Sequence, residues 1–242
     1  MLWVKRVWLP PSPLAGKKYM QKDLFDGALG DTGLPPGVNI LRSFVSRAEQ
    51  ESLLALCRQI AKRAPLVQPQ TRLGYNFSLS VTSVGDWGWF ANQTDGYHYR
   101  TQHPHTNEPW QPMPAEFRQI AAAAARACLI DDYNPDTCLI NFYPAQTGKL
   151  GLHQDNTEKD LKSAIVTVSL GDSCRFSIGG LQRSDARLRV VLESGDVCVM
   201  HGAGRMLFHG VDGLVDGSSD LLKDGGRISL TFRRNEPEQK RV

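Results

Sequence analysis

The chain has 242 residues, 41% of them hydrophobic and 22% charged, with a formal net charge of +3, which suits one globular domain with extensions. No apolar run approaches the roughly 20 residues that span a bilayer, and the N-terminus lacks the apolar core of a signal peptide, so we expect neither a membrane protein nor a secreted one. The five cysteines form no Cys-x-x-Cys pair, which indicates reduced thiols and a cytoplasmic location.

The N-terminal part of the chain combines an irregular arm with a first helix. Residues 1–37 are rich in proline and glycine, which predicts an extended arm. Ser46 and Glu49 then form a capping-box pattern, and apolar residues recur at helical spacing behind them. We therefore expect a helix over 46–63 that ends before Pro65.

A strand, a long connection and a second helix are predicted next. Residues 75–84 alternate apolar and polar side chains and predict a strand. Residues 85–112 are aromatic and rich in glycine and proline, which indicates an ordered loop or a β-ribbon of the kind that often carries function. A helix follows from Pro114 or Ala115 to Cys128, because proline suits a first helical turn.

Short strands separated by turn residues dominate the rest of the chain. We predict them at 137–143, 149–153, 164–170, 174–178, 188–192, 196–200, 206–209 and 227–233. Many short strands favour a sandwich or a jelly roll. With two helices before them, the predicted class is α+β with a double-sheet core.

His153 and Asp155, with His209 far behind them, form a candidate metal site. Residues i and i+2 of a strand point to the same face, so His153 and Asp155 converge on one point. Two imidazoles and one carboxylate can hold one face of a non-haem iron and leave positions open for oxygen. The chain has six histidines, so the pattern alone also fits histidines with structural roles.

Arg227, Ser229 and Arg233 lie on one face of the last predicted strand, because their spacing is even. Arginine offers a permanently charged, bidentate fork that suits a dicarboxylate. From the strand pattern alone, an ordinary charged edge strand is an equally good interpretation.

Three sequence blocks together resemble one enzyme family. They are residues 141–155 (NFYPAQTGKLGLHQD), 203–210 (AGRMLFHG) and 227–233 (RISLTFR), supported by 165–171 (IVTVSLG) and the turn at 179–185 (GGLQRSD). Their order and spacing resemble the AlkB family of Fe(II)- and 2-oxoglutarate-dependent dioxygenases, over residues 37 to 234.

The resemblance implies a double-stranded β-helix, or jelly roll, and a set of binding roles. It divides the chain into the arm (1–37), the helices and a nucleotide-recognition lid (38–136), the oxygenase core (137–234) and a tail (235–242). The implied metal ligands are His153, Asp155 and His209 for Fe(II), with O2 as the oxidant. The implied 2-oxoglutarate contacts are Asn141, Tyr143, Arg227, Ser229 and Arg233, with one carboxylate on Arg233 and the other on Arg227.

Residues 87–99 resemble the family's lid. The resemblance implies that Trp89 stacks on the target base and that Tyr97 and Tyr99 line its pocket, with His98 and Arg183 also facing the substrate. Aromatic residues alone would equally fit a hydrophobic cluster under a loop. One departure concerns Thr157, which stands where relatives carry an acid that reads the base; Glu158 is a candidate to replace that acid.

The implied reaction is oxidative demethylation of 1-methyladenine and 3-methylcytosine, releasing formaldehyde, succinate and CO2, in the repair of alkylated DNA. We expect a monomer that acts on alkylated single- or double-stranded DNA, with RNA as a further candidate substrate. A dioxygenase of a protein or small molecule is the main alternative, which the aromatic lid and basic tails disfavour. A non-catalytic jelly roll would not need an intact ligand set, and common zinc signatures are absent from the sequence.

Overall fold

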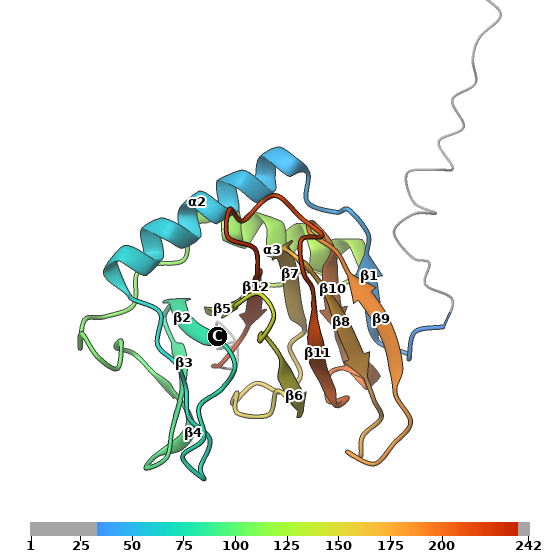
Figure 1. Ribbon diagram of the computed structural model, residues 1–242. Helices are drawn as coiled ribbons and strands as arrows, with labels where there is room; N and C mark the ends of the chain where they lie inside the picture. Colours follow the sequence, from blue (N-terminus) through green and yellow to red (C-terminus); the bar gives the residue numbers. More distant parts are fainter. Residues whose placement is uncertain (1–32, 237–242) are drawn as a thin grey trace, which may run out of the picture.

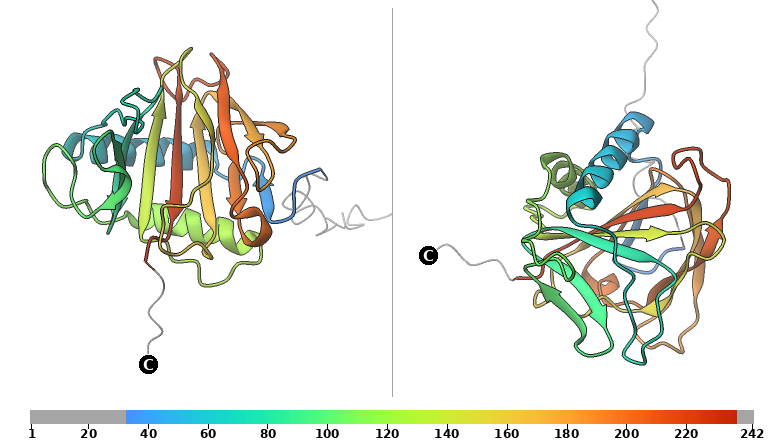
Figure 2. Two further views of the ribbon diagram at one scale, coloured as in Figure 1. Left: turned by 90° about the horizontal axis from the view of Figure 1, so that it is seen from below. Right: turned by 60° about the vertical axis from the view of Figure 1, so that its left-hand side comes forward.

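The computed structural model describes residues 33–236. The predicted arm therefore lies almost wholly outside the described residues, as does most of the predicted tail. Two antiparallel sheets face each other, and both helices lie against the outer side of the larger sheet, with a two-stranded ribbon at one flank (Figures 1 and 2). This arrangement confirms the predicted α+β class with a jelly-roll core.

The larger sheet has the strand order β1-β10-β7-β12-β5-β2, and the smaller one β6-β11-β8-β9. The larger sheet contains β1 (Val38–Leu41), β10 (Val197–Met200), β7 (Ile165–Gly171), β12 (Arg227–Arg233), β5 (Thr137–Tyr143) and β2 (Ser80–Gly85). The smaller sheet contains β6 (Leu150–His153), β11 (His209–Val215), β8 (Ser173–Ile178) and β9 (Leu188–Leu192). The ribbon pairs β3 (Gly88–Asn92) with β4 (Gly96–Arg100), and a short 3-10 helix, η1, spans Gly202–Gly204.

The two helices form where the sequence predicts them. Helix α2 (Arg47–Arg63) begins with the expected capping box, in which the side chains of Ser46 and Glu49 satisfy each other's backbone N–H groups. Helix α3 (Ala115–Ala127) follows Pro114, which occupies the N-cap. No helix within residues 33–236 is long and apolar enough to cross a membrane.

The larger sheet separates two hydrophobic cores, and β12 contributes its apolar side chains to the core beneath the helices. Its side chains Ile228, Leu230 and Phe232 pack with α2 and α3. The opposite face of the sheet packs against the smaller sheet, where residues such as Leu139 and Phe176 form the second core. Alternate β12 residues turn toward this inter-sheet space, so polar residues on that face enter the interior of the protein.

Two strand predictions need correction. The predicted strand 75–84 begins only at Ser80, because the chain before it folds back on itself: Gln70 bridges Asn76, and Val67 bridges Val81. The predicted strand 206–209 is instead β11, which starts at His209 and continues to Val215. Its register shifts between Val211 and Gly213, where Gly213 has a φ of +155° that glycine adopts readily.

The strand β1 was not predicted. It has only four residues, and its partner is β10, more than 150 positions later in the chain. The other predicted strands from residue 137 onward are confirmed within one residue at each end.

Candidate active site

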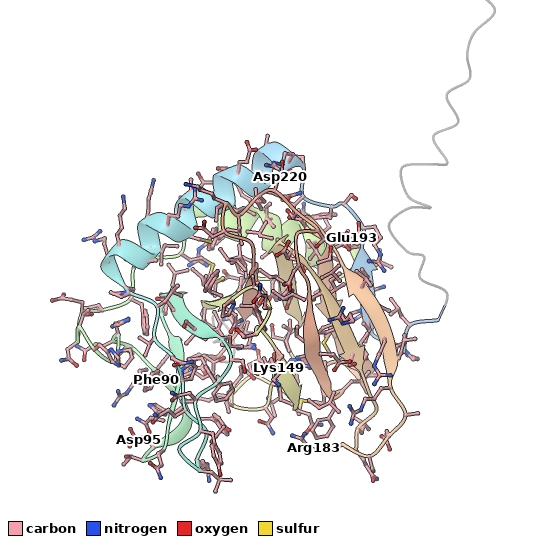
Figure 3. The ribbon with its side chains drawn as sticks, in the orientation of Figure 1. Phe90, Asp95, Lys149, Arg183, Glu193 and Asp220 are labelled. Carbon is pink, nitrogen blue, oxygen red and sulfur yellow. The ribbon has the colours of Figure 1, made fainter. Side chains whose placement is uncertain are left out.

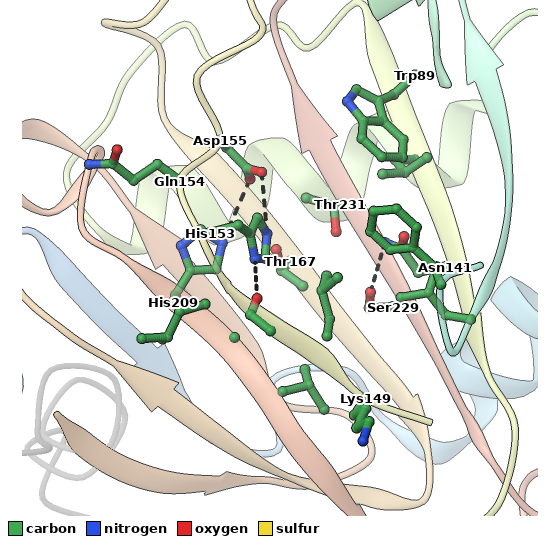
Figure 4. Close-up of a pocket in the computed structure, with 18 of the residues that line it drawn as sticks. Trp89, Asn141, Lys149, His153, Gln154, Asp155, Thr167, His209, Ser229 and Thr231 are labelled. Atoms are coloured by element: carbon green, nitrogen blue, oxygen red, sulfur yellow. Dashed lines mark hydrogen bonds and ion pairs between the residues drawn. The ribbon is translucent and has the colours of Figure 1, made fainter. Parts of the chain in front are cut away.

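A cavity of about 900 Å³ opens between the two sheets and beside the ribbon. Its lining includes most of the residues that the sequence singles out: Trp89, Tyr97, Asn141, Tyr143, His153, Asp155, Thr157, Arg183, His209, Arg227, Ser229 and Arg233. In the close-up, His153, Asp155 and His209 gather on one side, while Trp89, Asn141 and Ser229 lie across the cavity (Figure 4). The fold therefore brings together groups from both halves of the chain.

The three candidate metal ligands converge. Strands β6 and β11 pair so that His153 lies directly opposite His209, and Asp155 follows two residues after β6 ends. The Oδ1 atom of Asp155 lies 3.6 Å from Nε2 of His153, and Oδ2 lies 3.8 Å from Nε2 of His209. One ligand atom from each residue lies within 4.8 Å of the other two. Two nitrogens and one oxygen in this arrangement fit a divalent iron with open coordination positions.

The backbone orients both imidazoles for metal binding. Nδ1 of His153 lies 3.0 Å from the carbonyl oxygen of Gly151, and Nδ1 of His209 lies 3.0 Å from that of Leu207. A carbonyl only accepts, so each Nδ1 carries the proton and each Nε2 keeps a free lone pair on the side of Asp155. Burial, helped by nearby His153, lowers the pKa of His209 to about 4, which keeps this ring neutral at physiological pH.

Arg233 holds the carboxylate of Asp155 in place. Its Nε and Nη2 both donate to Oδ2, at 3.0 and 2.7 Å, and both side chains are buried. Burial alone would raise the pKa of Asp155, but Arg233, His209 and His153 outweigh burial and hold that pKa well below its usual range. Because Oδ2 takes both of these bonds, Oδ1 stays available on the side of His153.

Arg227 offers an unsatisfied charged donor at another point of the cavity. It is 2% exposed, its Nη2 donates to Ser169 at 2.9 Å, and its guanidinium lies 5.2 Å from the ring centre of Tyr143. Its Nε is buried and has no hydrogen-bond partner among the described residues. A buried guanidinium N–H without an acceptor fits a site built for an anionic ligand. Nearby, Asn141 donates to Ser229 at 3.2 Å.

An aromatic cluster forms the cavity wall on the ribbon side. Trp89 and Tyr97 lie nearly parallel, with ring centres 6.0 Å apart, and Phe77 meets both edge-on. Asp95, in the β3–β4 turn, and Arg183, between β8 and β9, lie at the same end of the molecule on opposite sides of it (Figure 3). Trp89 and Tyr97 of the ribbon and Arg183 of the β8–β9 loop all line the cavity, so its wall combines aromatic rings with a cation.

Two lid residues lie elsewhere than the sequence predicts. His98 does not line the cavity: it packs edge-on against Phe90, on the ribbon face opposite Trp89 and Tyr97. This follows from strand alternation, because neighbouring residues point to opposite faces. Tyr99 lies on the same face as Tyr97, but its hydroxyl is taken up by a hydrogen bond to Glu158 rather than lining the cavity.

Glu158 lies away from the cavity, which differs from the expectation that it replaces an acid at the position of Thr157. Its side chain is fully buried and lies outside the cavity lining, with its oxygens engaged by Tyr99 and Arg205. Thr157, by contrast, lines the cavity. Among the described lining residues, Asp155 is the only acid, and Arg233 already binds it.

Sequence reasoning missed several lining residues. Thr231 lies between Ser229 and Arg233 on the same face of β12, so the even spacing could have identified it. Lys149 and Phe77 also line the cavity. Phe77 stands at even spacing from Leu79 and Val81, and all three pack in or against the second core, so the alternation over 75–84 could have indicated its direction.

Comparisons with known proteins agree with this geometry. Residues 37–233 match the family model of the 2OG-Fe(II) oxygenase superfamily. The chain is 41% identical over 213 residues to the alpha-ketoglutarate-dependent dioxygenase AlkB of Escherichia coli (strain K12), covering 88% of this chain and 97% of that protein. It is 36% identical to the AlkB homolog of Caulobacter vibrioides (strain NA1000 / CB15N), over 82% of this chain and 88% of that one.

Solved structures and more distant relatives extend the similarity. A structure of OsALKBH1 superimposes with a TM-score of 0.72 at 29% identity, covering 83% of this chain and 99% of that one. A protein of Arabidopsis thaliana named DNA N(6)-methyladenine demethylase ALKBH1D is 31% identical over 82% of this chain and 49% of its own length. The matched region, 37–233, contains every cavity residue named above.

Proposed function

Because the chain belongs to the AlkB family of Fe(II)- and 2-oxoglutarate-dependent dioxygenases, we propose that it removes alkyl groups from damaged nucleobases by oxidation. The observation that carries the proposal is one cavity that combines the His153, Asp155 and His209 cluster, two buried arginines and an aromatic ribbon. The expected products are the repaired base, formaldehyde, succinate and CO2.

Fe(II) would be held by His153, Asp155 and His209. Two neutral imidazoles and one carboxylate fit this ion, and when bound it supplies oxygen activation together with 2-oxoglutarate. The chain's own contribution is orientation: the carbonyls of Gly151 and Leu207 fix the imidazoles, and Arg233 fixes the carboxylate. Ligands fixed in this way would bind the ion without a further ordering of their side chains.

The dicarboxylate would be held by the polar face of β12. Arg227 has a buried, unpartnered Nε that can donate to one carboxylate, and Arg233 lies beside the metal ligands for the other. Tyr143 lies opposite Arg227 and Asn141 lies opposite Ser229 in the β5–β12 pairing, and all line the cavity and supply further hydrogen-bonding groups. A fixed guanidinium is suited to this role because it stays charged and binds carboxylates bidentately.

The nucleobase would enter beside Trp89 and Tyr97. A base inside a duplex cannot reach a cavity between two sheets, so it must be flipped out or supplied single-stranded. Stacking on Trp89 would hold the base, and Arg183 and Thr157 would contact its polar edge or the adjoining phosphates. We propose 1-methyladenine and 3-methylcytosine in DNA as substrates, with RNA as a further substrate.

The biological setting is also part of the proposal. All five cysteines are unpaired and buried, which supports a reducing cytoplasm. We propose a monomer, in which the arm, the lid region, the oxygenase core and the tail keep the boundaries expected from the sequence. The alternative substrate class, a protein or small molecule, would use the same metal and co-substrate residues without the aromatic wall.

Mass spectrometry of a 1-methyladenine oligonucleotide tests the proposal directly. The protein is incubated with the oligonucleotide, Fe(II) and 2-oxoglutarate, and each addition is omitted in turn. Loss of one methyl group that requires both additions is the expected result. Succinate production without any loss of methyl from DNA or RNA would instead favour the protein or small-molecule alternative.

A further inference from the structure

A hydrogen bond joins the ribbon to the segment that carries the metal ligands. Tyr99 lies on β4, and its hydroxyl donates to Oε1 of Glu158 at 2.6 Å. Glu158 stands three residues after Asp155 in the chain. Burial raises the pKa of Tyr99 well above its usual value, so the hydroxyl keeps its proton and remains a donor. The ribbon is thereby tied to the backbone that positions Asp155.

Glu158 is itself firmly anchored. Its side chain is fully buried, its Oε2 lies 3.2 Å from Nη2 of Arg205, and its Oε1 lies 3.5 Å from Nε of Arg233. Arg205, 2% exposed, also donates to the carbonyl oxygens of Asp155 at 2.6 Å and Ser163 at 2.9 Å. A buried carboxylate is tolerated only with such partners. Arg205 therefore clamps the segment from Asp155 to Ser163 around Glu158.

The ribbon has few other polar links to the jelly roll. Its strands pair with each other, and the carbonyl of Ala91 accepts from Gln70, which lies outside both sheets. Within residues 33–236, Tyr99 is the only ribbon side chain that hydrogen-bonds to the jelly roll or to the metal-binding segment. The ribbon also packs against β2 and β5 through apolar side chains such as Ala91 and Trp89, so Tyr99 adds a polar contact with the metal-binding segment to this apolar packing.

We propose that Tyr99 and Glu158 form a latch that holds the lid ribbon against the metal-binding segment, with Arg205 bracing Glu158. The latch aligns the aromatic wall of Trp89 and Tyr97 with the ligand cluster around Asp155. Tyr99, Glu158 and Arg205 are thus positioning residues. The part of the latch that concerns nucleobase alignment rests on the proposed function, whereas the docking of the ribbon does not.

Hydrogen–deuterium exchange of the full metal-free chain tests the docking step. The variant Tyr99→Phe removes only the hydroxyl, and Tyr75→Phe is the matched control, because Tyr75 is 70% exposed and its hydroxyl has no hydrogen bond among the described residues. Loss of a hydrogen bond to a charged group should speed exchange in residues 88–100 by about 10- to 100-fold. Exchange in α2 and β12 should match the wild type, as should the control everywhere.

Replacement of Glu158 provides a second test of the latch by the same exchange experiment. Glu158→Gln keeps an acceptor for Tyr99 but loses the charge facing Arg205, so ribbon exchange should lie between the wild type and Glu158→Ala. Unchanged ribbon exchange in Tyr99→Phe would overturn the latch. Acceleration spread equally over α2 and β12 would overturn it too, because it would indicate general destabilisation.

The coupling step has its own readout. Tyr99→Phe should bind Mn(II) like the wild type, yet repair about tenfold fewer bases per succinate formed, since the ribbon no longer holds the base in register. An unchanged ratio of repaired base to succinate would overturn the alignment role. If the wild type repaired no base while ribbon exchange still accelerated in the variant, the latch would stand and the proposed function would fall.

Discussion

Asp155 connects the stability of the fold to the proposed metal site, so its replacement should change both. In Asp155→Ala the buried Arg233 loses the partner that it binds at 2.7 and 3.0 Å. Breaking a buried ion pair costs about 3–5 kcal/mol. Glu158 lies 3.5 Å from the same guanidinium and still offsets part of its charge in the variant. We therefore expect the free energy of unfolding to fall by about 3 kcal/mol, the lower end of that range. For a chain of this size that lowers the melting temperature by about 6–12 °C.

The assay separates the two effects. Thermal unfolding of the metal-free protein measures how much the ion pair contributes to stability. Titration with Mn(II) in the absence of oxygen measures how much Asp155 contributes to metal affinity. Asp155→Asn keeps one acceptor for Arg233, so it should lose only about half as much stability. Both variants should lose more than about 100-fold in Mn(II) affinity, since removing a ligand exceeds the effect of removing its supporting partner.

Asp212 provides the matched control for this prediction. It lies three residues after His209, is 35% exposed, and pairs with Ser177 and Arg189 at 2.7 and 3.0 Å. Asp212→Ala should lower the free energy of unfolding by about 1 kcal/mol or less and leave Mn(II) affinity unchanged. Wild-type Mn(II) affinity in Asp155→Ala would refute the metal site. Equal stability losses in Asp155→Ala and Asp212→Ala would refute the assigned role of the buried ion pair.

Four further predictions concern the lid, the co-substrate, alkaline pH and the core. Trp89→Ala should raise the KM for the oligonucleotide by about 5- to 100-fold, from the loss of base stacking, while 2-oxoglutarate affinity measured by calorimetry stays unchanged. Arg227→Lys should weaken 2-oxoglutarate binding about 10- to 100-fold in the same calorimetric experiment, because the planar fork is lost. Burial raises the pKa of Cys57 to about 12 from 9.0, so this thiol stabilises the fold below pH 9 and the contribution is lost as pH rises toward 12. Urea unfolding of Cys57→Ala should therefore show a pH slope shallower by about 1.4 kcal/mol per unit in that window. Phe117→Ala removes a fully buried ring whose centre lies 5.8 Å from the ring centre of Phe232. Urea unfolding should show that it lowers the free energy of unfolding by about 3–5 kcal/mol.

Local patterns predicted those parts of the fold whose signals lie within one element. The capping box at Ser46 and Glu49 marked the start of α2, because both partners stand within one helical turn. The even spacing of Arg227, Ser229 and Arg233 placed these three on one face of a strand, and all three line the cavity. Because successive side chains of a strand point to opposite faces, the sequence of the ribbon also predicts that His98 points away from Tyr97 and Tyr99.

Long-range pairing explains what the sequence could not show. Strand β1 forms because it pairs with β10 at the edge of the larger sheet. Its four residues are too few to give a clear alternation of apolar and polar side chains. Glu158 is a sharper case. Its position beside the metal ligands favoured a role in reading the base, but Tyr99 and Arg205, 59 and 47 residues away, draw it into the interior. Only the folded chain shows which neighbours a buried charge has.

Strand β12 shows why fold and site are hard to separate in this protein. All seven of its residues are buried, yet four of them are polar or charged. Ile228, Leu230 and Phe232 fasten the strand to the helices, which fixes the opposite face rigidly between β5 and β7. That rigidity is what lets Arg227 and Arg233 point into the cavity at fixed positions, and preorganised charges bind an anion without the cost of ordering flexible side chains. The apolar half of the strand thus determines the geometry of the polar half.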